Sequence, residues 1–117
     1  MSAENRASIL DRAKQIICRE RNNEYGEPEY SFSQIAEYWE AYIKHNCASP
    51  GADVDLTARD VALMMALFKV GRLETSLFDS YDSFIDLIGY SACAADIEFP
   101  YVAKQTEKES MNENKKL

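Results

Sequence analysis

The spacing of hydrophobic positions along the chain predicts four helices. Apolar residues three and four positions apart recur in residues 4–21 and 31–46, as they do when one face of a helix is buried. In the third segment, residues 57–73, the stretch from Val61 to Phe68 is apolar on every side, so we expect a central helix packed on several neighbours. The fourth segment covers residues 81–97. Stretches that contain turn-forming or polar residues separate the four segments.

The ends of the segments and the shortness of the connections predict how the helices are arranged. Ser2 is a predicted N-cap of the first helix, and Thr57, followed three residues later by Asp60, has the pattern of a capping box. Short connections favour antiparallel neighbours, so we expect an all-α protein with an antiparallel four-helix arrangement. The helical domain is expected to span residues 1–100. The polar tail, residues 101–117, is expected to be disordered.

The charge balance and the cysteines narrow the function classes. The 13 Lys and Arg against 20 Asp and Glu give a net charge of −7, which argues against binding to DNA or RNA. A small anionic ligand would then need a local cluster of cations or a metal. Three cysteines without CxxC spacing favour reduced thiols and a cytoplasmic protein, that of a bacterial host if the chain comes from a phage. The longest apolar run has eight residues, well below the ~20 of a membrane span. We therefore expect no membrane partner.

The third and fourth segments carry the residues with the clearest chemical potential. Lys69 and Arg72 share one face of the third helix, and Asp82 and Asp86 share one face of the fourth. The short connection makes these helices antiparallel neighbours, so the two cations and two acids are expected to lie at one level. Paired carboxylates can hold Mg²⁺, or Mn²⁺ in its place, while Lys and Arg neutralise phosphate oxygens. The alternative interpretation is a set of salt bridges that only aligns the two helices.

The acidic face of the fourth helix continues into residues that are not typical of a solvated surface. Asp82 and Asp86 are followed on this face by Gly89, Tyr90 and Cys93 rather than by further charges. This pattern predicts a half-buried cleft or a subunit interface.

Two further features are weaker candidates for a site. Glu37 and Glu40 form an ExxE pair on the second helix, a pattern that binds divalent metals in several bundle proteins. A solvated face, with Glu40 paired to Lys44, explains the same residues. Tyr25, in the turn before Gly26, could stack on a nucleotide base or cover the core.

Several strings of the sequence resemble a family of small phage and prophage proteins of unknown function. They include EYGEP at residues 24–28, DVALMM at 60–65, KVGRL at 69–73 and DSFIDLIGY at 82–90, and the resemblance covers about residues 21–95. That family is similar in turn to the all-α NTP pyrophosphatases, which include MazG-like proteins and dimeric dUTPases. The similarity implies an Mg²⁺ site with ExxE on one helix and ExxD on a later one. Glu37 and Glu40 match ExxE, whereas Asp82 and Asp86 depart from ExxD.

These features lead to two functional hypotheses. The first is Mg²⁺-dependent hydrolysis of a (deoxy)nucleoside triphosphate, with Glu37, Glu40, Asp82 and Asp86 as catalytic metal ligands and Lys69, Arg72 and Tyr25 binding the substrate. The alternative is a non-enzymatic phage or prophage protein that binds or sequesters a nucleotide or a host protein. Under either hypothesis we expect a homodimer or a higher homo-oligomer, because the apolar third helix needs more cover than one small bundle gives.

Overall fold

The computed structural model describes residues 2–77 and 80–115; the side chains of residues 25, 104–107 and 114–115 lie outside the described part. Six α-helices and one π-helical turn make up almost all of it, and the described residues form no strand. They are α1 (Ala3–Gln15), the π-helical turn η1 (Ile16–Arg21), α2 (Asn22–Tyr25), α3 (Pro28–Asn46), α4 (Ala58–Thr75), α5 (Ser80–Glu98) and α6 (Val102–Lys115). The all-α prediction is confirmed, and each of the four predicted segments corresponds to a helix.

The helix ends follow from local chemistry. The Ser2 hydroxyl accepts a hydrogen bond from the backbone N–H of Asn5, which caps α1 as predicted. At the start of α4 the Thr57 hydroxyl accepts from the Asp60 N–H, and the Asp60 carboxylate accepts from the Thr57 N–H at 2.9 Å, which completes the predicted capping box. Gly26, with a φ of +76°, ends α2 in a conformation that favours glycine. Pro28 then occupies the first turn of α3.

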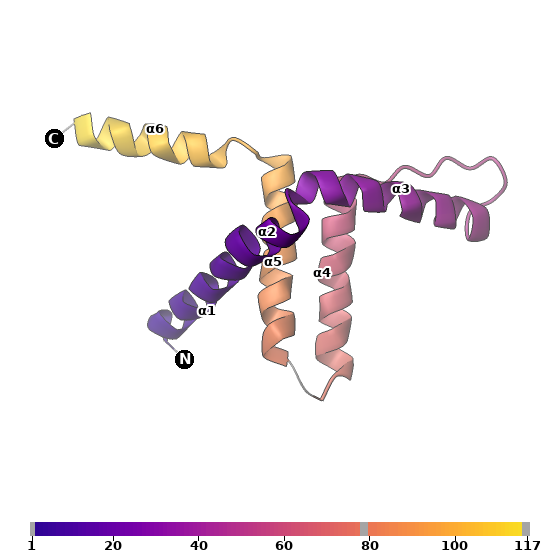
Figure 1. Ribbon diagram of the computed structural model, residues 1–117, viewed down its shortest axis with the longest axis horizontal. Coiled ribbons are helices and arrows are strands. Elements are labelled where there is room, and N and C mark those ends of the chain that lie inside the picture. Colours follow the sequence, from indigo (N-terminus) through magenta and orange to yellow (C-terminus); the bar gives the residue numbers. More distant parts are fainter. Residues whose placement is uncertain (1, 78–79, 116–117) are drawn as a thin grey trace.

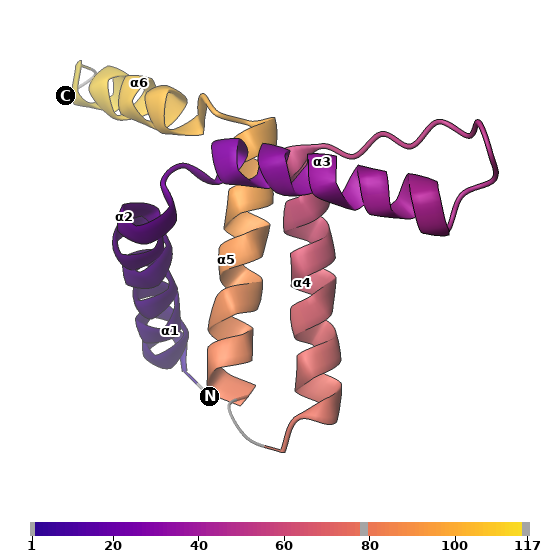
Figure 2. The ribbon, with the colours of Figure 1, turned by 45° about the vertical axis from the view of Figure 1, so that its right-hand side comes forward.

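The helices meet around the hairpin of α4 and α5. These two helices lie antiparallel and side by side (Figures 1 and 2), while α3 crosses the end where α4 begins and α5 finishes. The α1 helix packs on the other side of α5. The crossing of α3 is a departure from a bundle of parallel and antiparallel helices, because hydrophobic periodicity specifies which face is buried and not the angle at which helices cross.

The core is small and built largely from small side chains. Ala62, Cys93 and Ala94 form its buried cluster, with Ile17 and Phe32 packed against it. Gly89 allows the closest approach: a Cβ atom at this position would lie 2.9 Å from two carbons of the Ile17 side chain. This contact holds η1, the segment that follows α1, against α5.

The C-terminal segment differs in part from the sequence prediction. Residues expected to form a disordered tail are helical from Val102 to Lys115. This helix projects away from the hairpin (Figure 1), in keeping with its polar composition. Residues such as Glu, Lys, Gln and Met have high helix propensity, which accounts for a helix without core packing.

Within the described residues, no helix combines the length and the hydrophobicity that a membrane crossing requires.

Candidate functional site

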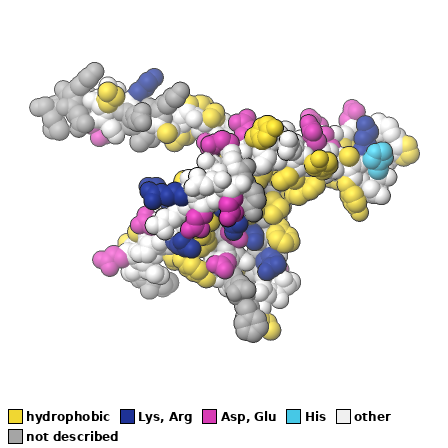
Figure 3. Space-filling model, viewed as in Figure 1, with side chains coloured by type: hydrophobic (Ala, Val, Ile, Leu, Met, Phe, Trp, Pro, Cys, Tyr) yellow, Lys and Arg dark blue, Asp and Glu magenta, His cyan; other side chains and the backbone are white. Residues whose placement is uncertain are grey.

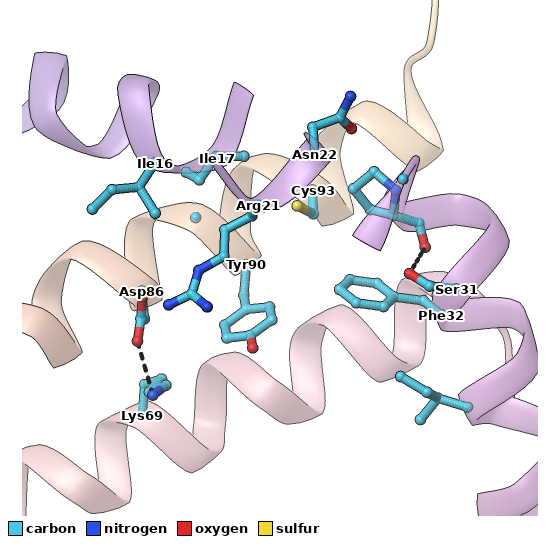
Figure 4. Close-up of a pocket in the computed structure, with 14 residues that line it drawn as sticks. Ile16, Ile17, Arg21, Asn22, Ser31, Phe32, Lys69, Asp86, Tyr90 and Cys93 are labelled. Atoms are coloured by element: carbon cyan, nitrogen blue, oxygen red, sulfur yellow. Dashed lines mark hydrogen bonds and ion pairs between the residues drawn. The ribbon is translucent and has the colours of Figure 1, made fainter. Parts of the chain in front are cut away.

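A cavity of about 390 Å³ opens between the first half of the chain and the α4–α5 hairpin. Its volume lies within the range of about 300–1,000 Å³ that is typical of small-molecule sites. Figure 4 shows the residues around it. The cavity is lined by Ile16, Ile17, Arg21, Asn22, Gly26, Pro28, Ser31, Phe32, Ile35, Lys69, Asp86, Gly89, Tyr90 and Cys93.

One side of the cavity is aromatic. The rings of Phe32 on α3 and Tyr90 on α5 lie with their centroids 6.1 Å apart and their planes tilted by 35°. Their separation is within the range of about 4.5–7 Å at which aromatic pairs attract each other. Both rings border the cavity, so they offer apolar surface to a flat ligand.

The other side of the cavity carries charge. Lys69 on α4 and Asp86 on α5 form an ion pair at 2.9 Å, and about a fifth of each side chain is exposed, 19% and 21%. Two predictions are thereby confirmed: these residues are neighbours, and the face of α5 that holds Asp86, Gly89, Tyr90 and Cys93 borders a cleft.

Arg21 adds a second cation to this wall. Its side chain extends from η1 into the cavity, toward the space between Asp86 and Tyr90 (Figure 4). None of the ion pairs formed by the described residues includes Arg21. The lining residues therefore carry two positive charges and one negative charge, in a chain whose net charge is −7.

The π-helical turn η1 determines which residues reach the cavity from the N-terminal side. It supplies Ile16, Ile17 and Arg21, and Asn22 follows directly in α2. Wide turns of this kind are rare and frequently occur at functional sites. Asn22 is half-buried and lines the cavity, with its amide turned away from the rings of Phe32 and Tyr90 in Figure 4.

Cys93 belongs to the wall as a packing residue. Its burial, more than the nearby Asp96 and Cys18, raises the pKa of the thiol to about 11. A thiol with this pKa stays protonated at neutral pH, and the thiolate is the nucleophilic form. The environment of Cys93 thus agrees with the sequence interpretation of a small core residue.

The predicted metal ligands are not brought together within one chain. Glu40 Oε1 accepts a hydrogen bond from the backbone N–H of Leu56, and Glu37 is exposed on α3. Asp82 is exposed in the first turn of α5, at the end of the hairpin away from α3 (Figure 1). No three His, Cys, Asp or Glu side chains among those described are grouped so that they could hold a metal ion. In the described part of one chain these acids therefore lie apart, and an Mg²⁺ site built from them stays a prediction.

The crossing of α3 explains why these acids lie apart. It places the helix that carries Glu37 and Glu40 at one end of the hairpin, whereas Asp82, in the first turn of α5, lies at the other end.

The remaining candidates have different outcomes. Arg72 and Asp82 are exposed, and neither takes part in an ion pair between described residues, so the predicted cluster of four charges is reduced to Lys69 and Asp86. The side chain of Tyr25 lies outside the described part, and its predicted contact with a base stays a prediction.

Sequence reasoning missed Arg21, Asn22 and Phe32 as site residues. Arg21 and Asn22 resembled the solvated end of a helix, and Phe32 an ordinary core position. The face of α5 that continues into Gly89 and Tyr90 was the one signal that pointed to this cavity.

The arrangement is suited to a ligand with an anionic end and a flat ring. Arg21 offers a planar, bidentate donor, and Lys69 offers a second positive charge. Tyr90 lies one turn after Asp86 on α5, with the Arg21 guanidinium between the two side chains in Figure 4, and Asn22 and Ser31 also line the cavity.

Comparison with known proteins points to phages. Residues 8–98 match a family described as a domain of unknown function, DUF6378. The Gene 55 protein of Mycobacterium phage D29 is 34% identical over 86 residues, which are 74% of this chain and 50% of that protein. The Gene 55 protein of Mycobacterium phage L5 is 31% identical over 93 residues, 80% and 54% of the two chains. No solved structure matches.

The predicted resemblance to small phage proteins of unknown function is confirmed by these matches. The chain spans about half the length of the two Gene 55 proteins. Similarity to the all-α NTP pyrophosphatases is not shown by the comparisons and stays a prediction.

Proposed function

We propose that this chain, which belongs to the DUF6378 family, a domain of unknown function, binds a nucleotide or a similar small phosphorylated ligand in its cavity. The observation that carries the proposal is Arg21, which extends into the cavity without an ion-pair partner among the described residues. The Arg21 guanidinium, together with Lys69 and its partner Asp86, gives this wall a net positive charge among the described residues, which attracts phosphate in a chain of net charge −7.

The second support for the proposal is the arrangement of the walls. A base or another flat ring would lie against Phe32 and Tyr90, while phosphate oxygens accept hydrogen bonds from Arg21. The cavity volume of about 390 Å³ suits a nucleotide rather than a long oligonucleotide.

The test is calorimetry with the common NTPs, dNTPs and nucleoside monophosphates, carried out in EDTA. We expect at least one nucleotide to bind, and Arg21→Gln to weaken binding at least tenfold, because a hydrogen bond to a charged group contributes about 1.5–3 kcal/mol. The matched control is Arg19→Gln, which changes an exposed arginine of η1 that does not line the cavity. Absence of binding by every nucleotide, or equal effects of the two variants, would refute the proposal.

Mg²⁺-dependent hydrolysis is the second candidate, and Asp86 is the observation that favours it, since this acid lies in the same cavity as Lys69. The described residues of one chain provide no group of three metal ligands, so we derive no catalytic step. Repeating the calorimetry with Mg²⁺ or Mn²⁺ and measuring pyrophosphate release separates the two functions. A hydrolase releases pyrophosphate and loses this turnover in Asp86→Asn, whereas a binding protein releases no pyrophosphate with or without the substitution.

A further inference from the structure

The side of α4 that points away from α5 is apolar and exposed. It consists of Leu63, Met64, Leu67, Phe68 and Val70, which we call the outer face of α4. Leu67 is 69% exposed and Phe68 is 52% exposed, and the other three exceed a third. In Figure 3 hydrophobic side chains gather in the corner between α3 and α4. Contiguous exposed apolar surface of this kind marks an interaction site.

The chain exposes more surface than a compact monomer of its mass. Its accessible area is 9320 Å², against about 6,450 Å² for a compact monomer of this mass. The radius of gyration is 17.9 Å, against about 13.4 Å for a compact chain of this length. Part of the excess belongs to α6, which projects from the body. The whole excess is roughly 2,900 Å² per chain, and what remains of it after the share of α6 can be compared with the roughly 1,000–2,500 Å² that each partner of an obligate interface buries.

We propose that the outer face of α4 packs against the same face of a second copy of this chain, related by a two-fold axis. The face carries no charge, since Lys69 is the only charged residue between Asp60 and Arg72, and it pairs with Asp86 on α5. When two different proteins bind, complementary charges speed their encounter and exclude wrong partners. Two identical apolar helix faces can pack against each other without complementary charges.

The geometry of the hairpin fits such a pairing. Two hairpins that pair in this way place α4 against α4 of the second copy, with each α5 on the outside, and helix-on-helix packing of this kind buries the apolar face of each α4. A two-fold contact between identical patches is also the commonest assembly of soluble proteins. The proposal does not depend on what the cavity binds, because the outer face of α4 contributes no residue to it.

The oligomeric state provides the test. Light scattering on the eluting protein at tens of micromolar should give about twice the chain mass of 13.3 kDa. Leu67→Glu, which places a charge in the middle of the outer face, should give a monomer. The matched control is Leu10→Glu, since Leu10 is also an exposed leucine, at 56%, but lies on α1. This control should stay dimeric.

A cross-linking experiment keeps the proposal testable if Leu67→Glu does not fold. With Cys18 and Cys47 replaced by serine, Leu67→Cys should form an intermolecular disulfide on mild oxidation, because residues near a two-fold axis meet their own copies. Leu10→Cys should not. A monomeric wild-type chain, which would leave the face to another partner, would overturn the proposal. So would a dimer that tolerates Leu67→Glu and does not cross-link through Leu67→Cys.

Discussion

Lys69 and Asp86 form their ion pair with about four-fifths of each side chain removed from solvent. In such a position both groups lose much of their hydration, and their mutual attraction compensates only while both are present. Arg21 extends toward the same wall, and Asp86 is the one acid among the residues that line the cavity. Asp86 therefore offsets one of the two cations, and the residues that line the cavity keep a net positive charge.

Asp86→Asn should lower the free energy of unfolding by about 1–3 kcal/mol, between the values for exposed and fully buried pairs. Urea denaturation followed by circular dichroism measures this loss. Asp82→Asn is the control, because Asp82 is exposed one turn earlier on α5 and forms no ion pair with a described residue. We expect the control to cost less than about 1 kcal/mol. Equal losses in the two variants would show that the pair adds no stability.

At the scale of the elements, the sequence predicted what depends on local chemistry and burial of one face. Phe32 and Ile35 follow helical spacing, and the pair Thr57 and Asp60 has a capping pattern, so the helices and the start of α4 could be anticipated. The crossing of α3 and the π-helical turn could not, because both arise from how helices fit together. The position of Arg21 depends on both, so the decisive cation of the site was missed.

The capping box at α4 makes stability depend on pH. The backbone hydrogen bond from Thr57 is the main cause that lowers the pKa of Asp60 from its ordinary value of 3.8. The folded chain thus binds fewer protons at Asp60 than the unfolded chain does near this pH. The stabilisation is present above pH 3.8 and is lost as the pH falls through the lowered pKa.

Asp60→Asn should therefore reduce stability by about 0.5–1 kcal/mol at pH 7, the range of a helix cap. The difference from the wild type should shrink toward zero in acid. Denaturation curves at neutral pH and at successively lower pH values measure it. Asp55→Asn, in the loop before α4, is the control for removing a negative charge near this helix. A difference that stays constant with pH would contradict the assignment.

On the scale of the whole molecule, the chain extends over 63 × 38 × 24 Å around a small core. The α4–α5 hairpin joins α1 and α3 into one body, while α6 leaves it (Figure 2). Most of the packing energy thus comes from residues before Phe99. The sequence predicts a domain of residues 1–100 followed by a polar tail, with its boundary at the same place in the chain. That domain boundary stays a prediction.

Deletion of residues 103–117 tests that boundary. Because α6 projects from the body and is polar, we expect the melting temperature to change by less than about 3 °C, which corresponds to roughly 0.5 kcal/mol for a domain of this size. Nucleotide affinity in EDTA should also stay unchanged. A shorter deletion of residues 110–117 serves as the control for the loss of charged residues. A large fall in melting temperature with only the longer deletion would place α6 within the folded unit.

The single wide turn of η1 acts like a one-residue insertion in a helix. In an unbroken α-helix, the residues one turn after Ile16 and Ile17 are Glu20 and Arg21; the i→i+5 pattern of a π-helix substitutes Arg21 and Asn22. Glu20 is thereby rotated out of the cavity wall and pairs with Arg12 at 3.6 Å on the exposed side. If this turn were regular α-helix with no residue removed, Glu20 would take the place of Asn22 in the wall, and its carboxylate would offset the charge of Arg21. The wide turn thus changes what this segment gives the wall from a neutral pair of side chains to a positive one.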